Sequence, residues 1–500
     1  MKSSLFKSIS TGYLLFVISN LIGLVLTPFI LRHVTNAEYG LYVVSLDIIA
    51  WVGLVQFGTA SVLGPKIAAF LGKPEAYRDQ INQMASTAFF MQILYAFAGM
   101  LLFFLVSTYL LDMASLVLKS GRQFSIILGL CAFCAILNQV FSAMIIATKR
   151  LYLDSLIQIM ATALNAILVV VFIDRLGLMA LAYVLLISNV LVLVRSYLLV
   201  KRLFPGLVLS LKLFERRDLN FLFGNGIYLA IGGFSMLLIT RFDNFIIGKM
   251  ISLEVVTYFY ITGKLFYLLN QILSRLINNF RPYISQYNGA GQFKHIADFY
   301  LASNRLLLVA CPLLAVLVVT SNKAFVSLWI SERYYLGLPI TMLLGINFIV
   351  QLIVLPPRAI LASTLYQVKA HSALKVVEAV CKVGLALLLM RWWGVSGLVV
   401  ATIVSTFIFS VLPFDYLVRR FFRENDPGLL VPASPAYWLL ILVPIVPVLV
   451  NQTLGSNAFH ISVCLVAGIL AASLFIWLRK DELGLLARTF ARLRIRTSSP

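Results

Sequence analysis

Residues 27–46 read TPFILRHVTNAEYGLYVVSL, in which a short polar segment, RHVTNAEYG at residues 32–40, separates two apolar runs. This pattern recurs along the chain, because 61% of its 500 residues are hydrophobic and only 12% are charged. The mean hydropathy is +0.97. Such a composition is too apolar for a surface that meets water. The sequence therefore predicts a polytopic membrane protein.

The predicted fold class is all-α, with about 14 transmembrane helices, because lipid offers no hydrogen-bond partner to the backbone of an open strand or loop. The region 241–286 allows two spans, or one long span preceded by a re-entrant stretch. We count it as a connection at 244–256 followed by one helix. The predicted spans are residues 12–33, 40–63, 83–111, 123–148, 152–173, 176–200, 219–241, 257–280, 299–320, 336–363, 372–391, 396–418, 436–451 and 458–478.

The distribution of Lys and Arg predicts the orientation. With the N-terminus inside, the predicted cytoplasmic segments carry roughly three times as many basic residues as the outer segments. This bias predicts an even number of helices and two cytoplasmic termini. It also accounts for much of the net charge of +21 without a nucleic-acid partner. The tail at residues 481–500 is predicted to be a basic cytoplasmic segment beside anionic membrane lipids.

Several basic residues fall within the predicted spans or at their edges, where a buried cation costs about 3 kcal/mol and is expected to face a protein interior or a wet cavity. They are Arg195, Arg241, Lys264, Arg275, Arg305, Arg358, Lys375 and Lys382. Helical spacing groups five of them on polar stripes. The stripes are Tyr260, Lys264, Gln271, Arg275 and Asn278; Asn347, Gln351 and Arg358; and His371, Lys375, Glu378 and Lys382.

These stripes hold several cations but a single acid, Glu378, so a predicted interior with excess positive charge favours an anionic guest. Structural pairing and snorkelling to the membrane surface are the competing interpretations. Asp47 is either an acceptor in helix packing or, like Glu378, a candidate site for a coupling ion, H⁺ or Na⁺. The candidate substrate-binding residues are Lys264, Arg275, Arg305, Arg358, Lys375, Lys382, Tyr260, Tyr267, Asn278 and Gln351.

A similar segment occurs 216 residues later, where TPFILRHVTNAEYGLYVVS aligns with DNFIIGKMISLEVVTYFYI without a gap. The pair Glu38 and Tyr42 meets Glu254 and Tyr258 in this alignment. The same shift carries the first predicted helix onto the seventh, as expected for a transporter built from two repeated bundles. The predicted division is a six-helix bundle at 1–210, a second at 211–425, and two additional helices at 426–480.

The segments SNLIGLVLTPFILRHVTNAEYGLYVVS, VGLVQFGTASVLGP, RFDNFIIGKMISLEVVTYFYITGKL and RPYISQY resemble the Wzx-type flippases of O-antigen and capsular polysaccharide. These form the polysaccharide-transporter branch of the multidrug/oligosaccharidyl-lipid/polysaccharide (MOP) superfamily. The resemblance extends from the first helix to the last, through degenerate apolar patterns. It implies two pseudo-symmetric bundles around a cavity, in the bacterial cytoplasmic membrane. It also implies that undecaprenyl-diphosphate-linked oligosaccharides are flipped by alternating access.

Such a lipid-linked oligosaccharide brings phosphates that Arg and Lys can hold, and hydroxyl groups suited to Tyr, Asn and Gln side chains. A polysaccharide polymerase and a chain-length regulator are candidate partners. The alternatives are a multidrug or cation exporter related to the MATE transporters, which would place acids in its cavity, and a flippase for another lipid-linked precursor such as lipid II. No cofactor is expected. An enzyme is disfavoured, because no paired acids near the first span and no Gly-rich phosphate loop appear.

Overall fold

The computed structural model describes residues 2–71, 78–114, 120–148, 150–278, 280–363 and 368–425. These residues contain ten helical segments long and apolar enough to cross a membrane. The chain divides into two compact units, Met1–Thr257 and Tyr258–Pro500. The predicted all-α, polytopic fold is confirmed. The predicted spans 436–451 and 458–478 and the basic tail 481–500 lie outside the described residues.

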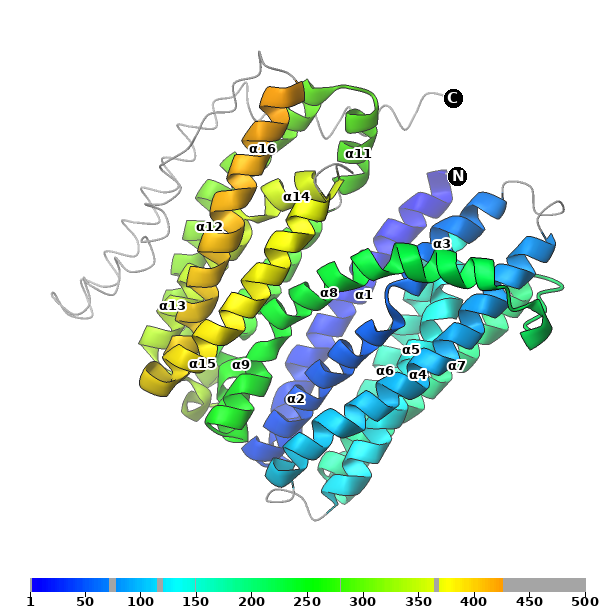
Figure 1. Cartoon of the computed structure of the whole chain (residues 1–500). Coiled ribbons are helices and arrows are strands. Elements are labelled where there is room, and N and C mark those ends of the chain that lie inside the picture. The colour runs from blue at the N-terminus through cyan, green and yellow to red at the C-terminus, as the bar shows by residue number, and fades with distance from the viewer. Residues whose placement is uncertain are drawn as a thin grey trace. The chain divides into compact units, whose positions relative to one another are not determined.

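The first unit is built mainly from long helices that pack side by side. Within it, α5 contacts α4 and α7, while α6 contacts α7 and α1, as Figure 1 shows for α4 to α7. A cluster that includes Leu63, Ile67, Ala85 and Met144 forms a core between α3, α4 and α5. The helices are α1 (Lys2–Leu31), α2 (Asn36–Val52), α3 (Thr59–Phe70), α4 (Arg78–Ala114), α5 (Gly121–Ala147), α6 (Leu151–Leu176), α7 (Leu178–Leu203) and α8 (Arg216–Met250), followed by the start of α9 (Leu253–Thr262).

The second unit contains the rest of α9 and the helices that carry the predicted polar stripes. Its core includes Phe348, Ile360 and Phe414, and α13 contacts α10, α12 and α15. The helices are α10 (Lys264–Asn278), α11 (Arg281–Gly289), α12 (Phe293–Trp329), α13 (Leu338–Ile353), α14 (Leu355–Ser363), α15 (Val368–Thr406), a π-helix at Phe407–Val411 and α16 (Leu412–Asn425).

The predicted single span 40–63 is wrong, because the chain leaves the helix at Phe57 and Gly58, which have φ angles of 50° and 67°. A buried amide stabilises this break. Gln92 of α4 donates to Gln56 Oε1 at 2.9 Å and to the Ile136 carbonyl at 2.8 Å, and it accepts from Thr59 Oγ1 at 3.2 Å. The partners that hold the break come from distant segments, so local sequence did not reveal it.

The predicted connection at 244–256 is also wrong, because α8 continues to Met250 and α9 begins at Leu253. The connection was predicted from the helix count, which places each later loop on a consistent side of the membrane. In the structure Arg241 and Asn244 lie on one face of α8 and bond to the carboxylate of Asp47. Arg241 and Asn244 therefore form a contact face of α8, which continues past the predicted end at residue 241.

The predicted helix 257–280 is two helices, α9 and α10, which meet at Gly263. The carbonyl of Thr262 accepts a hydrogen bond from Asn322 Nδ2 at 3.0 Å, and the Thr262 hydroxyl donates to the Tyr334 carbonyl at 3.2 Å. These contacts hold the end of α9 to α12 and to the segment before α13. The predicted span 336–363 is likewise divided into α13 and α14, because Pro356 and Pro357 have no backbone N–H to continue α13.

The segment Ser372–Asn425 has 54 residues, far more than the roughly 20 that one crossing needs. Gly394, with φ 54° and ψ −134°, kinks it, between the predicted spans 372–391 and 396–418. The repeat shift of 216 residues carries α1 onto α8 and the first residue of α2 to position 252, one residue before α9. The predicted bundle boundary between residues 210 and 211 stays a prediction.

Candidate functional site

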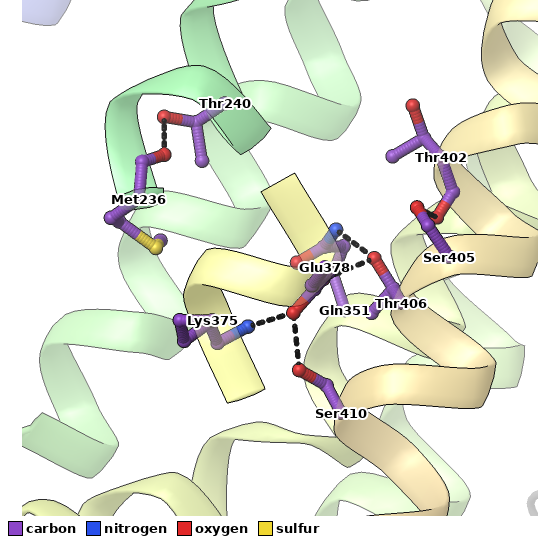
Figure 2. Close-up of polar contacts among 9 residues, drawn as sticks. All are labelled: Met236, Thr240, Gln351, Lys375, Glu378, Thr402, Ser405, Thr406 and Ser410. Atoms are coloured by element: carbon purple, nitrogen blue, oxygen red, sulfur yellow. Dashed lines mark hydrogen bonds and ion pairs between the residues drawn. The ribbon is translucent and has the colours of Figure 1, made fainter. Parts of the chain in front are cut away.

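Glu378 of α15 is fully buried and has three partners (Figure 2). Lys375 Nζ donates to Glu378 Oε2 at 2.7 Å, and Ser410 Oγ donates to the same oxygen. Thr406 Oγ1 donates to Oε1 at 2.9 Å. Burying a carboxylate is costly unless charges and hydrogen bonds compensate it. The contacts to Glu378 supply both kinds of compensation.

Two lysines flank Glu378 on one face of α15. Lys375 lies three residues before it and Lys382 four residues after it, which is the spacing of neighbours on a helix surface. Their relative exposures are 4% and 1%. Lys375 Nζ also lies 5.4 Å from the centroid of the Phe414 ring, a distance suited to a cation–π contact. With both lysines protonated, this buried group of three residues carries a net positive charge.

A π-helix at Phe407–Val411 positions the hydroxyl groups that bond to Glu378. Thr406 directly precedes it and Ser410 lies within it, and both side chains point to the carboxylate (Figure 2). Gln351 of α13 donates to Thr406 Oγ1 at 3.4 Å. Short π-helical turns are rare in proteins, but those that occur are often found at functional sites. We call Gln351, Lys375, Glu378, Lys382, Thr406 and Ser410 the Glu378 cluster.

The stripe predicted on residues 260–278 divides between two environments. Lys264 is buried, and its Nζ donates to Tyr260 Oη at 3.0 Å while lying 4.9 Å from the Tyr260 ring centroid. Tyr267, Arg275 and Asn278 lie on an exposed face of α10. This part of the stripe is exposed rather than enclosed in the core of the second unit.

Two further candidates, Arg305 and Arg358, lie on α12 and α14 respectively. The structure describes the helical backbone at both positions but not the two side chains. Their predicted contact with substrate stays a prediction.

Asp47 forms a separate charged group in the first unit. Its Oδ1 lies 3.1 Å from Arg241 NH1, and its Oδ2 accepts from Asn244 Nδ2 at 2.7 Å. Asp47 is 5% exposed, whereas the Arg241 side chain is 40% exposed. One turn along α2, the ring of Trp51 packs at 5.0 Å from that of Phe242. Asp47 thus joins α2 to α8, and its carboxylate remains a candidate for ion coupling.

Helical spacing predicted that Lys375, Glu378 and Lys382 share one helix face, and all three are buried on α15. It did not predict the hydroxyl groups that donate hydrogen bonds to Glu378. Thr406 and Ser410 have the i, i+4 spacing of a helix face, which was the only available signal. Arg241 was noted as a cation within a span, without Asp47 as its partner. Among the described residues, no group of three His, Cys, Asp or Glu side chains could hold a metal ion.

A family model described as "Polysaccharide biosynthesis protein" matches residues 29–336. No curated protein matches the chain. The MATE transporter VcmN of Vibrio cholerae, in its bent form, is 16% identical, covers 86% of this chain and 99% of its own, and gives a TM-score of 0.55.

Two other solved structures are similar. An outward-facing multidrug resistance MATE family transporter of the MOP superfamily is 16% identical and covers 85% of this chain and 96% of its own, with a TM-score of 0.58. A MOP superfamily transporter from Pyrococcus furiosus, described as having a binding pocket of reverse polarity, is 15% identical and covers 85% and 95%, with a TM-score of 0.53. At these identities the similarity shows a shared fold.

Proposed function

The chain belongs to the family of polysaccharide biosynthesis proteins, and from this premise we propose that it flips undecaprenyl-diphosphate-linked oligosaccharides across the bacterial cytoplasmic membrane. The fold it shares with MOP superfamily transporters supports movement of a substrate by alternating access. The observation that carries the choice of substrate is the buried, cation-rich Glu378 cluster.

The chemistry of the substrate matches this cluster. A diphosphate needs cationic donors, and its charge cannot cross about 30 Å of hydrocarbon unaided. Lys382 and Lys375 supply two buried ammonium groups, and Lys375 is paired with Glu378. Arg275 on the exposed face of α10 supplies a planar guanidinium that can bind phosphate through two hydrogen bonds. Tyr267, Asn278 and Gln351 are suited to sugar hydroxyls.

The sign of the charge favours this substrate over a cationic drug. A cavity that selects cations would gain from unpaired carboxylates, because opposite charges attract in a medium of low dielectric constant. Glu378 is instead paired with Lys375, and Asp47 with Arg241. A flippase for another diphosphate-linked precursor, such as lipid II, would use the same cations.

The two buried carboxylates are the proposed coupling sites. Protonation of Glu378 would remove the negative charge beside Lys375, so that this ammonium group could bind a phosphate instead. Flipping also moves negative charge, and each elementary charge moved through 100 mV is worth about 2.3 kcal/mol. A proton or sodium ion carried in exchange would change this electrical work. A polymerase that joins the exported repeat units, and a chain-length regulator, are the proposed partners.

The test is export in a bacterium whose own copy of the gene is deleted. We expect Lys382→Ala to reach the membrane in normal amounts, to lose most surface polysaccharide and to accumulate lipid-linked precursor. Lys382→Arg, which keeps the charge, is expected to restore part of the export. Lys323→Ala is the matched control, because the Lys323 side chain is 59% exposed and pairs with exposed Glu332.

Normal surface polysaccharide in Lys382→Ala would contradict the role of the cluster in transport. A deletion strain with unchanged polysaccharide but greater sensitivity to cationic drugs would contradict the proposed substrate.

A further inference from the structure

A groove of about 210 Å³ lies between α6 and α7 in the first unit. Leu156, Ile157 and Met160 of α6 form one apolar wall, and Leu198 of α7 lies on the other. The rest of the lining is Leu153, Leu199 and the two arginines of α7, Arg195 and Arg202. The lining residues recur at intervals of three and four on each helix, so each helix contributes a single face. The groove is therefore formed by two facing stripes.

The apolar wall is exposed on the first unit. Met160 is 61% exposed and Leu198 is 48% exposed. Of the candidate spans, α6 has the smallest share of buried residues, 11% of its most apolar window. Exposed side chains of this kind on a membrane helix contact acyl chains. The polar residues of α6 point elsewhere: Asp154 accepts from Ser142 of α5 at 3.0 Å, and Asn165 donates to Ser188 of α7.

The two arginines make the groove cationic. Among the described residues that line it, there are two guanidinium groups and no carboxylate. Arg202 is in the last turn of α7, which ends at Leu203. Arg195 lies two turns deeper, about 10 Å along the helix axis. A cation at that depth on a lipid-facing surface is unfavourable unless an anion compensates it. The groove thus combines an acyl-chain surface with a requirement for negative charge.

We infer that this groove binds an anionic phospholipid, with its phosphodiester at Arg195 and Arg202 and an acyl chain along Leu156, Met160 and Leu198. The planar guanidinium matches the geometry of two phosphate oxygens. A zwitterionic phospholipid offers the same phosphate, but its own ammonium group cancels the charge that two arginines favour. The inference does not depend on which glycan the protein carries.

The test measures lipid binding to the purified full-length protein in detergent, by native mass spectrometry over a titration. Phosphatidylglycerol, phosphatidylethanolamine, undecaprenyl phosphate and glycerol 3-phosphate are the probes. We expect phosphatidylglycerol to bind most tightly. In the double variant Arg195→Gln/Arg202→Gln its affinity is expected to fall about tenfold or more.

The matched control is the double variant Arg122→Gln/Arg175→Gln. Like the groove variant, it removes two positive charges. Arg122 lies in the first turn of α5 and Arg175 in the last turn of α6, whereas the groove lies at the start of α6 and the end of α7. This variant is expected to keep the affinity for phosphatidylglycerol. Met160→Trp keeps both arginines but fills the apolar wall, so it is expected to weaken binding as well. Unfolding temperatures without lipid verify that each variant is folded.

Equal loss of affinity in the groove and control variants would overturn the inference, because the binding would then follow net charge alone. Undecaprenyl phosphate binding more tightly than phosphatidylglycerol would also overturn it, by assigning the groove to the carrier lipid. Binding of glycerol 3-phosphate as tight as that of phosphatidylglycerol would exclude a role for the acyl wall.

Discussion

Lys375 and Glu378 form an ion pair at 2.7 Å in which the two side chains are 5% and 0% exposed. Replacing a buried ion pair by apolar residues can leave the free energy of unfolding unchanged. Removing only one partner lowers it strongly, because the other charge then stays buried without compensation. The presence of this pair in a bundle that hydrophobic packing alone could hold therefore favours a role in function over a role in stability.

The first prediction concerns this pair. Glu378→Ala is expected to lower the free energy of unfolding by about 3–5 kcal/mol, because it leaves Lys375 buried without its carboxylate. Thermal unfolding in detergent measures the change. Glu424→Ala is the control: its pair with Arg420 is exposed, at 42% and 51%, so a loss below about 1 kcal/mol is expected. Equal losses in both variants would show that burial does not set the strength of the internal pair.

The second prediction concerns the contact between α2 and α9. A Cβ atom on Gly40 would lie 1.9 Å from the Leu253 carbonyl oxygen, so Gly40→Ala is expected to separate the helices and cost about 1–3 kcal/mol. Gly12→Ala is the control, because a Cβ there meets nothing within 4 Å. It is expected to be neutral or to raise stability by up to about 1 kcal/mol. An unfolding temperature for Gly40→Ala at or above that of the wild type would refute the tight contact.

The third prediction concerns the break between α2 and α3. Gln92→Leu removes the amide that bonds to Gln56, Thr59 and the Ile136 carbonyl. We expect a loss of about 1–3 kcal/mol, because buried polar groups are left without partners. Thr162→Val is the comparison: it removes one hydroxyl bond, to the Gln158 carbonyl within the same helix. A Gln92→Leu protein as stable as Thr162→Val would mean that the break does not need this network.

The fourth prediction separates transport from stability at Arg275. Because this side chain is exposed, Arg275→Ala is expected to leave the unfolding temperature unchanged while it abolishes most polysaccharide export. Lys294→Ala, at another exposed basic position near the start of α12, is expected to export normally. The two variants are compared for surface polysaccharide at matched protein levels. Normal export by Arg275→Ala would remove this residue from the proposed substrate path.

The fifth prediction tests the two carboxylates as coupling sites. Flipping in proteoliposomes is measured with an imposed proton gradient or sodium gradient. If Glu378 couples transport, Glu378→Gln is expected to abolish the response to the driving gradient while Asp47→Asn retains it; the reverse result would assign coupling to Asp47. Retention of the full response in both variants would exclude both carboxylates as coupling sites.

The sequence predicted long helices well where apolar runs end at clear polar boundaries. The predicted spans 123–148 and 152–173 lie within three residues of the bounds of α5 and α6. It failed where polar residues serve tertiary contacts. Helical spacing did not identify Arg241 and Asn244 as partners of Asp47, because Asp47 lies about 200 positions earlier. For the same reason helical periodicity placed Lys375, Glu378 and Lys382 on one face, but could not identify Thr406 and Ser410 as their partners.

The π-helix at Phe407–Val411 also bears on how relatives of this protein are compared. A π-helical turn accommodates one more residue than an α-helical turn, so a relative one residue shorter at this point could keep the buried face of α16 in register. It would lose the position from which Ser410 reaches Glu378. A single alignment gap between residues 406 and 412 would therefore distinguish relatives that lack this arrangement of hydroxyl groups from those that share it.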